Sequence, residues 1–199
     1  GMSHVMKTHL GRSWWPLLVL ASLSLVACPE PEPKPASGTW SLVASALPEA
    51  LLSVGGTAAD DVWVVGSDKG SGPAVLHFDG ADWKAVPTGT RGSLWWVHAF
   101  AGGPVFFAGA NATVLRYDGT TFTRMPTPGV ARYTIFGVWG RTPTDLWAVG
   151  SIAGRNGFVW HSDGTTWTEV ELPDVPELPA SATGTTGDIP GLFKVWGDD

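Results

Sequence analysis

The side chains in this sequence that could bind a metal or transfer a proton are few and widely spaced. His77 and His161 occupy one position of a repeated sequence block, and Arg116 fills the same position in another copy. A position shared by histidine and arginine is typical of a strand surface, and no His-x-x-x-His spacing that would suit zinc occurs. The sequence therefore predicts neither a metal site nor a cofactor.

The acidic residues precede or occupy predicted turns. Asp60, Asp61 and Asp145 come just before strand-forming segments, where their carboxylates could cap a turn or contact Ca²⁺. Tyr117 and Tyr133 are the only tyrosines, and neither has the neighbouring acid and arginine cluster that a sialidase needs. We therefore expect no catalytic residue in this chain.

The single cysteine, Cys28, excludes an intramolecular disulfide and a cysteine-cluster metal site. It follows Leu25-Val26-Ala27, and this run resembles the lipobox of bacterial lipoproteins. The resemblance implies cleavage between Ala27 and Cys28 and attachment of a diacylglyceryl group to the Cys28 thiol. A plain secretory signal that ends in cysteine and a buried strand are the alternatives.

The segment before Cys28 has the organisation of a secretion signal. Residues 1–28 contain the apolar run Leu17–Ala27, which is too short for a transmembrane helix but suits a signal peptide. Residues 29–37 alternate proline with charge and predict a stiff tether. We expect a bacterial cell-envelope protein held on the membrane by its N-terminal lipid. Pro29, in place of aspartate after the cysteine, favours the outer membrane or cell surface.

The composition favours short strands over helices. The 199 residues include 26 Gly, 16 Pro and 12 Trp, and 15% are charged. The 44% of hydrophobic residues suffice for a buried core. The net charge of −6 argues against a phosphate-binding surface, so nucleic acid is not an expected partner.

Internal repeats organise the rest of the chain. One block recurs without gaps at Val54–Gly66, Val97–Gly109 and Val138–Gly150. A second block follows each copy, at Ala74–Val86, Thr113–Met125 and Phe158–Val170. Copies spaced by roughly 40 residues are typical of stacked structural units.

Each copy predicts four short antiparallel strands. The first has a Leu-x-x-Val pattern, and an Asp-Gly pair between the third and fourth predicts a hairpin, because both residues tolerate positive φ. Four strands per copy indicate an all-β fold, a β-propeller, with blades at about 51–86, 94–125 and 135–170. The repeat region is 38–199, with the start of a fourth blade at 192–199 and a strand at 38–43 that would close the ring. Since so few blades do not close, we expect a truncated product of a longer gene.

The pattern "VWG…DxWAVG…HxDGTxW" resembles the Trp- and Gly-rich propeller repeats of myxobacterial-type lipoproteins. The resemblance covers residues 38–199. The second copy departs from the pattern, with His98-Ala99 for Trp-Gly, Gly103-Pro104 at the aspartate position, and Phe106 and Phe122 for tryptophans.

These features predict a lipid-anchored binding or scaffold module for an unidentified protein or glycan, and not an enzyme. The alternative is the front part of a sialidase- or glycosidase-like propeller whose active site lies in further blades. Recurring aromatics such as Trp63 are expected to pack between blades. Trp95, Trp96 and Trp160 lie outside the consensus aromatic positions and are therefore the candidates for ligand contact.

Overall fold

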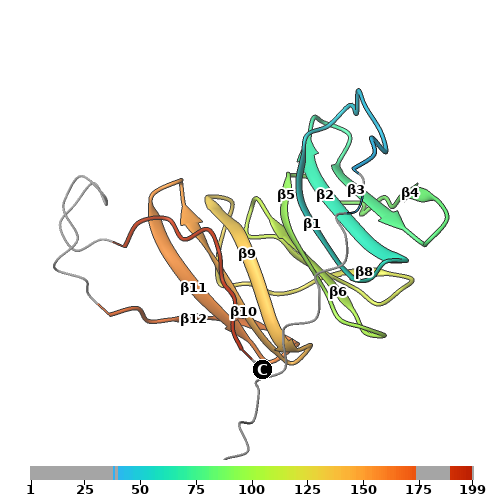
Figure 1. Ribbon diagram of the computed structural model, residues 1–199. Coiled ribbons are helices and arrows are strands. Elements are labelled where there is room, and N and C mark those ends of the chain that lie inside the picture. The colour runs from blue at the N-terminus through green and yellow to red at the C-terminus, as the bar shows by residue number, and fades with distance from the viewer. Residues whose placement is uncertain (1–37, 39, 174–188, 199) are drawn as a thin grey trace, which may run out of the picture. The chain divides into compact units, whose positions relative to one another are not determined.

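The computed structural model describes residues 38, 40–173 and 189–198. The chain divides into two units, Gly1–Val43 and Ala44–Asp199. In the second unit the described regular elements are all strands, arranged in three four-stranded antiparallel sheets (Figure 1), so the predicted all-β class is confirmed. The signal segment 1–28, the residues Ala27 and Cys28 and the tether 29–37 lie outside the described residues.

The three sheets follow one another along the chain, and each has its strands in sequential order. Sheet 1 consists of β1 (Leu51–Ala58), β2 (Asp61–Asp68), β3 (Pro73–Phe78) and β4 (Trp83–Ala85). Sheet 2 consists of β5 (Leu94–Ala99), β6 (Val105–Gly109), β7 (Val114–Tyr117) and β8 (Phe122–Arg124). Sheet 3 consists of β9 (Tyr133–Thr142), β10 (Asp145–Ile152), β11 (Asn156–Ser162) and β12 (Trp167–Val170).

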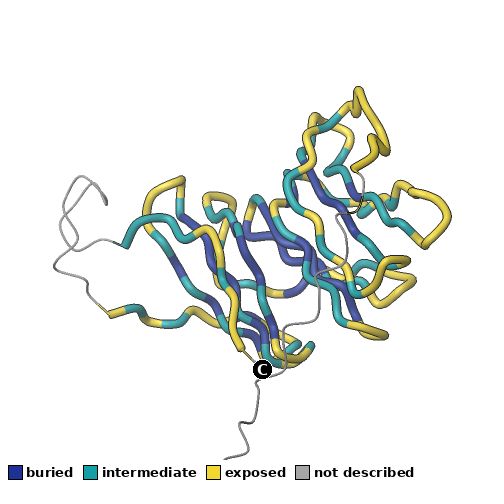
Figure 2. Tube along the Cα trace, viewed as in Figure 1, coloured by how far each residue is buried: buried dark blue, intermediate teal, exposed yellow. Residues whose placement is uncertain are grey.

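Two hydrophobic cores hold the sheets together, one on each face of sheet 2 (Figure 2). Along β6, Val105 and Phe107 face the core shared with sheet 1, whereas Phe106 and Ala108 face the core shared with sheet 3. This division follows from the two-residue period of a strand. Each fully buried large apolar side chain contributes about 1.5–3 kcal/mol relative to an exposed one. Sheet 2 is therefore the central layer of the packing.

The Asp-Gly pairs lie between the third and fourth strands, as expected, but the two residues act differently. Gly80, Gly119 and Gly164 have φ values of 93°, 98° and 92°, whereas no aspartate in the pairs has a positive φ. Each aspartate instead accepts hydrogen bonds from the backbone N–H groups two and three residues later. In sheet 3 the Thr165 hydroxyl and the N–H groups of Thr165 and Thr166 lower the pKa of Asp163 to about 2.

Two expected strands are not formed in the described residues. Gly38 and residues 40–43, part of the expected closing strand 38–43, have no strand assigned. A closing strand completes a blade that lacks its own fourth strand, and each of the three described sheets already has four strands of its own.

Residues 189–198, which include the expected start of a fourth copy, also form no strand but lie against sheet 3. The Leu192 N–H donates to the Gly150 carbonyl at 3.1 Å, and the Gly157 N–H donates to the Ile189 carbonyl at 2.8 Å. These two hydrogen bonds hold the segment against β10 and β11, and in the described ranges no second or third strand lies beside it.

Candidate functional site

The first strand of each sheet carries a β-bulge at the same position. In sheet 2, Leu94 pairs with Gly109 and Trp96 pairs with Ala108, which leaves Trp95 unpaired. Leu52 and Phe136 are left unpaired in the same way in sheets 1 and 3. A bulge bends the strand and redirects the side chain of the extra residue.

The bulge explains the Leu-x-x-Val spacing found in the sequence. Leu94 and Val97 are both buried in the core between sheets 1 and 2, although residues three apart in a regular strand point to opposite faces. The extra residue brings both side chains to the same face. The Leu-x-x-Val spacing, which breaks the two-residue period of a strand, was the signal for a bulge, and the bulge was not predicted from it.

The bulge positions of successive copies form an aromatic row. The ring of Trp95 meets the ring of Phe136 edge-on, with centroids 5.1 Å apart and planes at 90°. Phe136 stacks on Phe193, with centroids 4.7 Å apart and planes at 19°. Trp95 is 37% exposed and Phe193 is 61% exposed. We call Trp95, Phe136 and Phe193 the bulge row; it offers apolar ring surface to a ligand.

The other two tryptophans expected to contact a ligand are placed differently. Trp96 is partly buried against the core between sheets 2 and 3, and the Lys194 Nζ lies 3.8 Å from its ring centroid. Trp160 is fully buried and packs against Tyr133 and Phe158. The prediction that Trp160 is an exposed contact residue is therefore wrong. In the alignment of the copies it corresponds to the aliphatic residues Leu76 and Leu115, of which Leu115 is buried in a core, and this correspondence was the available signal.

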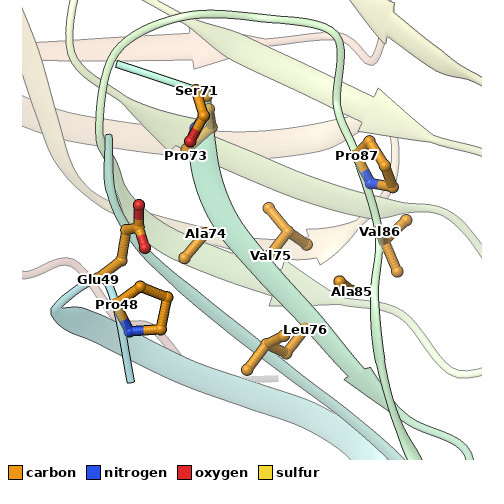
Figure 3. A pocket seen from close by; sticks show the side chains of 11 residues that line it. Pro48, Glu49, Ser71, Pro73, Ala74, Val75, Leu76, Ala85, Val86 and Pro87 are labelled. Atoms are coloured by element: carbon orange, nitrogen blue, oxygen red, sulfur yellow. The ribbon is translucent and has the colours of Figure 1, made fainter. Parts of the chain in front are cut away.

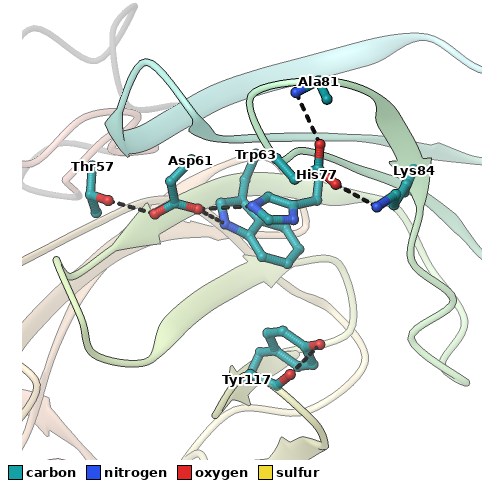
Figure 4. A network of polar contacts seen from close by, with 9 residues as sticks. Thr57, Asp61, Trp63, His77, Ala81, Lys84 and Tyr117 are labelled. Atoms are coloured by element: carbon teal, nitrogen blue, oxygen red, sulfur yellow. Dashed lines mark hydrogen bonds and ion pairs between the residues drawn. The ribbon is translucent and has the colours of Figure 1, made fainter.

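A polar group lies at the start of β2 in sheet 1 (Figure 4). The Asp61 carboxylate accepts a hydrogen bond from the Trp63 indole N–H at 3.0 Å and another from the Thr57 hydroxyl. The same carboxylate lies 2.9 Å from the His77 Nε2. The His77 ring stacks on Trp63 with centroids 4.0 Å apart. Asp61 thus holds the rings of Trp63 and His77 in their stacked orientation.

The electrostatics of Asp61 favour its charged form. Partial burial raises the pKa of this carboxyl, but hydrogen bonds from Thr57, His77 and Trp63 together outweigh burial. The pKa of Asp61 is therefore below its ordinary value. Asp61 is a permanent acceptor at neutral pH, as the indole N–H of Trp63 requires.

Sheet 3 repeats part of this group. The Asp145 carboxylate lies 2.9 Å from the His161 Nε2, and the His161 ring lies 4.6 Å from the Trp147 ring. Both histidines are partly exposed, which agrees with the surface position expected for them. In the described part of the chain, no hydroxyl or thiol bonds to either imidazole, and no cluster of three metal-ligating side chains occurs. Each of these two groups therefore holds a histidine ring against a tryptophan ring, and neither group contains a nucleophile.

A cleft of about 280 Å³ opens beside β3 and β4 (Figure 3). Pro48 and Glu49 form one wall, and most of the lining is apolar, including Ala74, Leu76 and Ala85. A carboxylate on one wall does not make a catalytic site, because the cleft holds no second acid or base. Its geometry suits contact with an apolar surface.

The described ranges contain no helix with the length and apolarity needed to span a bilayer. The sequence matches no protein-family model and no curated protein. The fold and the geometry of the candidate sites are therefore the grounds on which a function is proposed.

Proposed function

We propose that this protein is a lipid-anchored binding or scaffold module of the bacterial cell envelope, built as a β-propeller. The propeller is supported by three sheets that share their strand order, their bulge position and their face-to-face packing. A ring of blades requires this uniformity, because each blade must fit both neighbours in the same way. The lipid anchor is supported by the resemblance of Leu25–Cys28 to a lipobox.

The bulge row carries the binding proposal. Three aromatic rings occupy equivalent positions in consecutive copies, and two of them are exposed. In a propeller the first strands surround the central channel, so the row would be presented there. Apolar faces of sugar rings stack on exposed aromatic side chains, and a glycan is accordingly the ligand class that we favour.

Binding to a glycan array tests this proposal, with Trp95→Ala compared against Trp83→Ala. The two tryptophans are equally exposed, at 37% and 38%, but Trp83 lies outside the bulge row. We expect Trp95→Ala to weaken binding about tenfold and Trp83→Ala to leave it unchanged. Absence of binding to every glycan, or equal loss in both variants, would contradict the proposal.

Metabolic labelling with a clickable fatty acid tests the anchor. The label should be incorporated into the protein in bacterial cells and be lost in Cys28→Ala, because the thiol accepts the diacylglyceryl group. Equal labelling of both proteins would remove the anchor from the proposal.

A further inference from the structure

The charged side chains are divided between the two ends of the sheets. Because neighbouring strands are antiparallel, the first and third strands of each sheet begin at the same end, which we call the leading end. The leading end comprises the segments that join second strands to third strands and those that join one sheet to the next. Its acids among the described residues are Glu49, Asp68 and Glu171. Its cations are Lys69, Arg91, Arg124, Arg132 and Arg155.

The opposite end carries the reverse charge. It holds the three Asp-Gly turns together with Asp60, Asp61 and Asp145. No described residue in the turns of that end, or at the strand termini beside them, is a lysine or an arginine. The chain as a whole has a net charge of −6. An anionic ligand is therefore repelled least at the leading end.

A polar pocket of about 220 Å³ lies at the leading end. Residues 71–73, after β2, form one side of it, and residues 87–91, after β4, form the other. The lining includes the hydroxyl groups of Ser71, Thr88 and Thr90 and the guanidinium of Arg91. The pocket is smaller than the about 300–1,000 Å³ of a site for a drug-sized ligand, so it suits a single sugar residue.

Asp68 holds the two sides of this pocket together. Its carboxylate accepts hydrogen bonds from the backbone N–H groups of Gly70 and Gly72 on one side, at 2.7 and 2.9 Å, and of Gly92 on the other, at 2.7 Å. Arg91 also joins the sides, because its guanidinium donates to the Gly70 carbonyl. The pocket is thus shaped before a ligand binds, which lowers the entropic cost of binding.

Arg91 keeps donors for a ligand. A guanidinium has five N–H groups, and its planar fork binds a carboxylate through two parallel hydrogen bonds. Trp95 of the bulge row follows Arg91 by four residues, which span at most about 13–14 Å of extended chain. A short oligosaccharide can therefore reach from the pocket to the aromatic row.

We infer that the pocket beside Arg91 binds the acidic residue of a carboxylate-bearing glycan whose neighbouring sugars stack on the bulge row. This inference rests on the proposed glycan binding and names its ligand class. The Arg91 guanidinium binds the carboxylate, and the threonine hydroxyls bind ring hydroxyl groups of the same sugar. A neutral glycan would make no use of the cations gathered at this end.

Titration with charged and neutral forms of the same sugars tests this inference. The probes are short oligomers of galacturonic, glucuronic and mannuronic acid, each paired with its methyl ester, which keeps the rings and removes the charge. We expect the whole chain to bind at least one acid about tenfold more tightly than its ester. Arg91→Gln should abolish this preference and leave ester binding unchanged, whereas Arg91→Lys should keep part of it. Lys84→Gln is the control, because exposed Lys84 pairs with Asp79 beside the opposite end.

Several results would overturn the inference. They are equal binding of every acid and its ester, no binding of any acid, an equal loss of preference in Arg91→Gln and Lys84→Gln, and a loss of ester binding in Arg91→Gln, which would make Arg91 a structural residue. A protein that binds neutral glycans through Trp95 without preferring acids would keep the proposed function and lose this inference. An acid preference that depends on Arg91 but not on Trp95 would do the reverse.

Discussion

Sheet 2 differs from sheets 1 and 3 at three corresponding positions. Sheets 1 and 3 each carry an aspartate, a tryptophan and a histidine there, whereas sheet 2 carries Pro104, Phe106 and Arg116. Phe106 is fully buried and has no polar atom, so it needs no acceptor. The three replacements therefore belong together. All three sheets keep an aromatic side chain at this position, and the aspartate and the histidine are present only in the sheets where that side chain is a tryptophan.

The largest effect expected from this comparison is the loss of the shared packing. Phe106→Ala leaves a cavity between sheets 2 and 3 and should lower the free energy of unfolding by about 3–5 kcal/mol. Urea denaturation followed by tryptophan fluorescence measures this change. Val130→Ala, at an exposed loop residue, should have almost no effect. A loss of similar size in both variants would show that Phe106 does not hold the two sheets together.

A second prediction moves the polar group into sheet 2. Phe106→Trp overfills a closed core and buries an indole N–H without an acceptor, which should cost about 1–3 kcal/mol. Adding Pro104→Asp and Arg116→His should recover part of this loss in the same denaturation experiment. If the triple variant is no more stable than Phe106→Trp, the three positions are not a unit.

The hairpin glycines also distinguish the sheets. A Cβ at Gly119 in sheet 2 meets nothing within 4 Å, whereas at Gly164 in sheet 3 it lies 2.7 Å from the Pro143 carbonyl oxygen. Both residues have positive φ, so alanine at either should cost about 1–2 kcal/mol in backbone strain. Gly164→Ala should cost more, because backbone must also move. Thermal unfolding of the two variants would contradict this if Gly119→Ala had the lower Tm.

The smallest expected effect is that of Asp61→Asn, about 1 kcal/mol at neutral pH. Because hydrogen bonds lower the pKa of Asp61 in the folded state, its charge stabilises the fold above the unfolded pKa, about 4. This contribution should fade as the pH falls below about 4 and through the folded pKa. Asp60→Asn, at the exposed neighbouring residue, is the control. A difference between wild type and Asp61→Asn that stays constant down to pH 2 would contradict the prediction.

The repeats in the sequence predicted the three sheets well, because copies that align without gaps must share strands and turns. The periodicity also placed Trp63 correctly in the core between sheets 1 and 2. Trp160 was misjudged because aromatic residues were compared only with aromatic positions. Its aliphatic counterparts in the other copies would have placed it in the core, since burial depends on the face of the strand and not on residue type.

The candidate sites were less predictable. Trp95 was identified as a candidate contact residue, but its partners Phe136 and Phe193 were not, because the row joins side chains of different copies of the repeat. The contact of Asp61 with His77 joins the neighbouring strands β2 and β3, so it depends on the register in which they pair. Such contacts arise only when the sheets are assembled, and a single sequence specifies them indirectly.

The bulge in each first strand has an evolutionary consequence. Its extra residue takes no part in the hydrogen-bond ladder, and the three bulge residues Leu52, Trp95 and Phe136 accordingly differ while the flanking aliphatic residues persist. Duplicated units can thus acquire new recognition properties at this one site without loss of foldability, and selection can act on each duplicate independently.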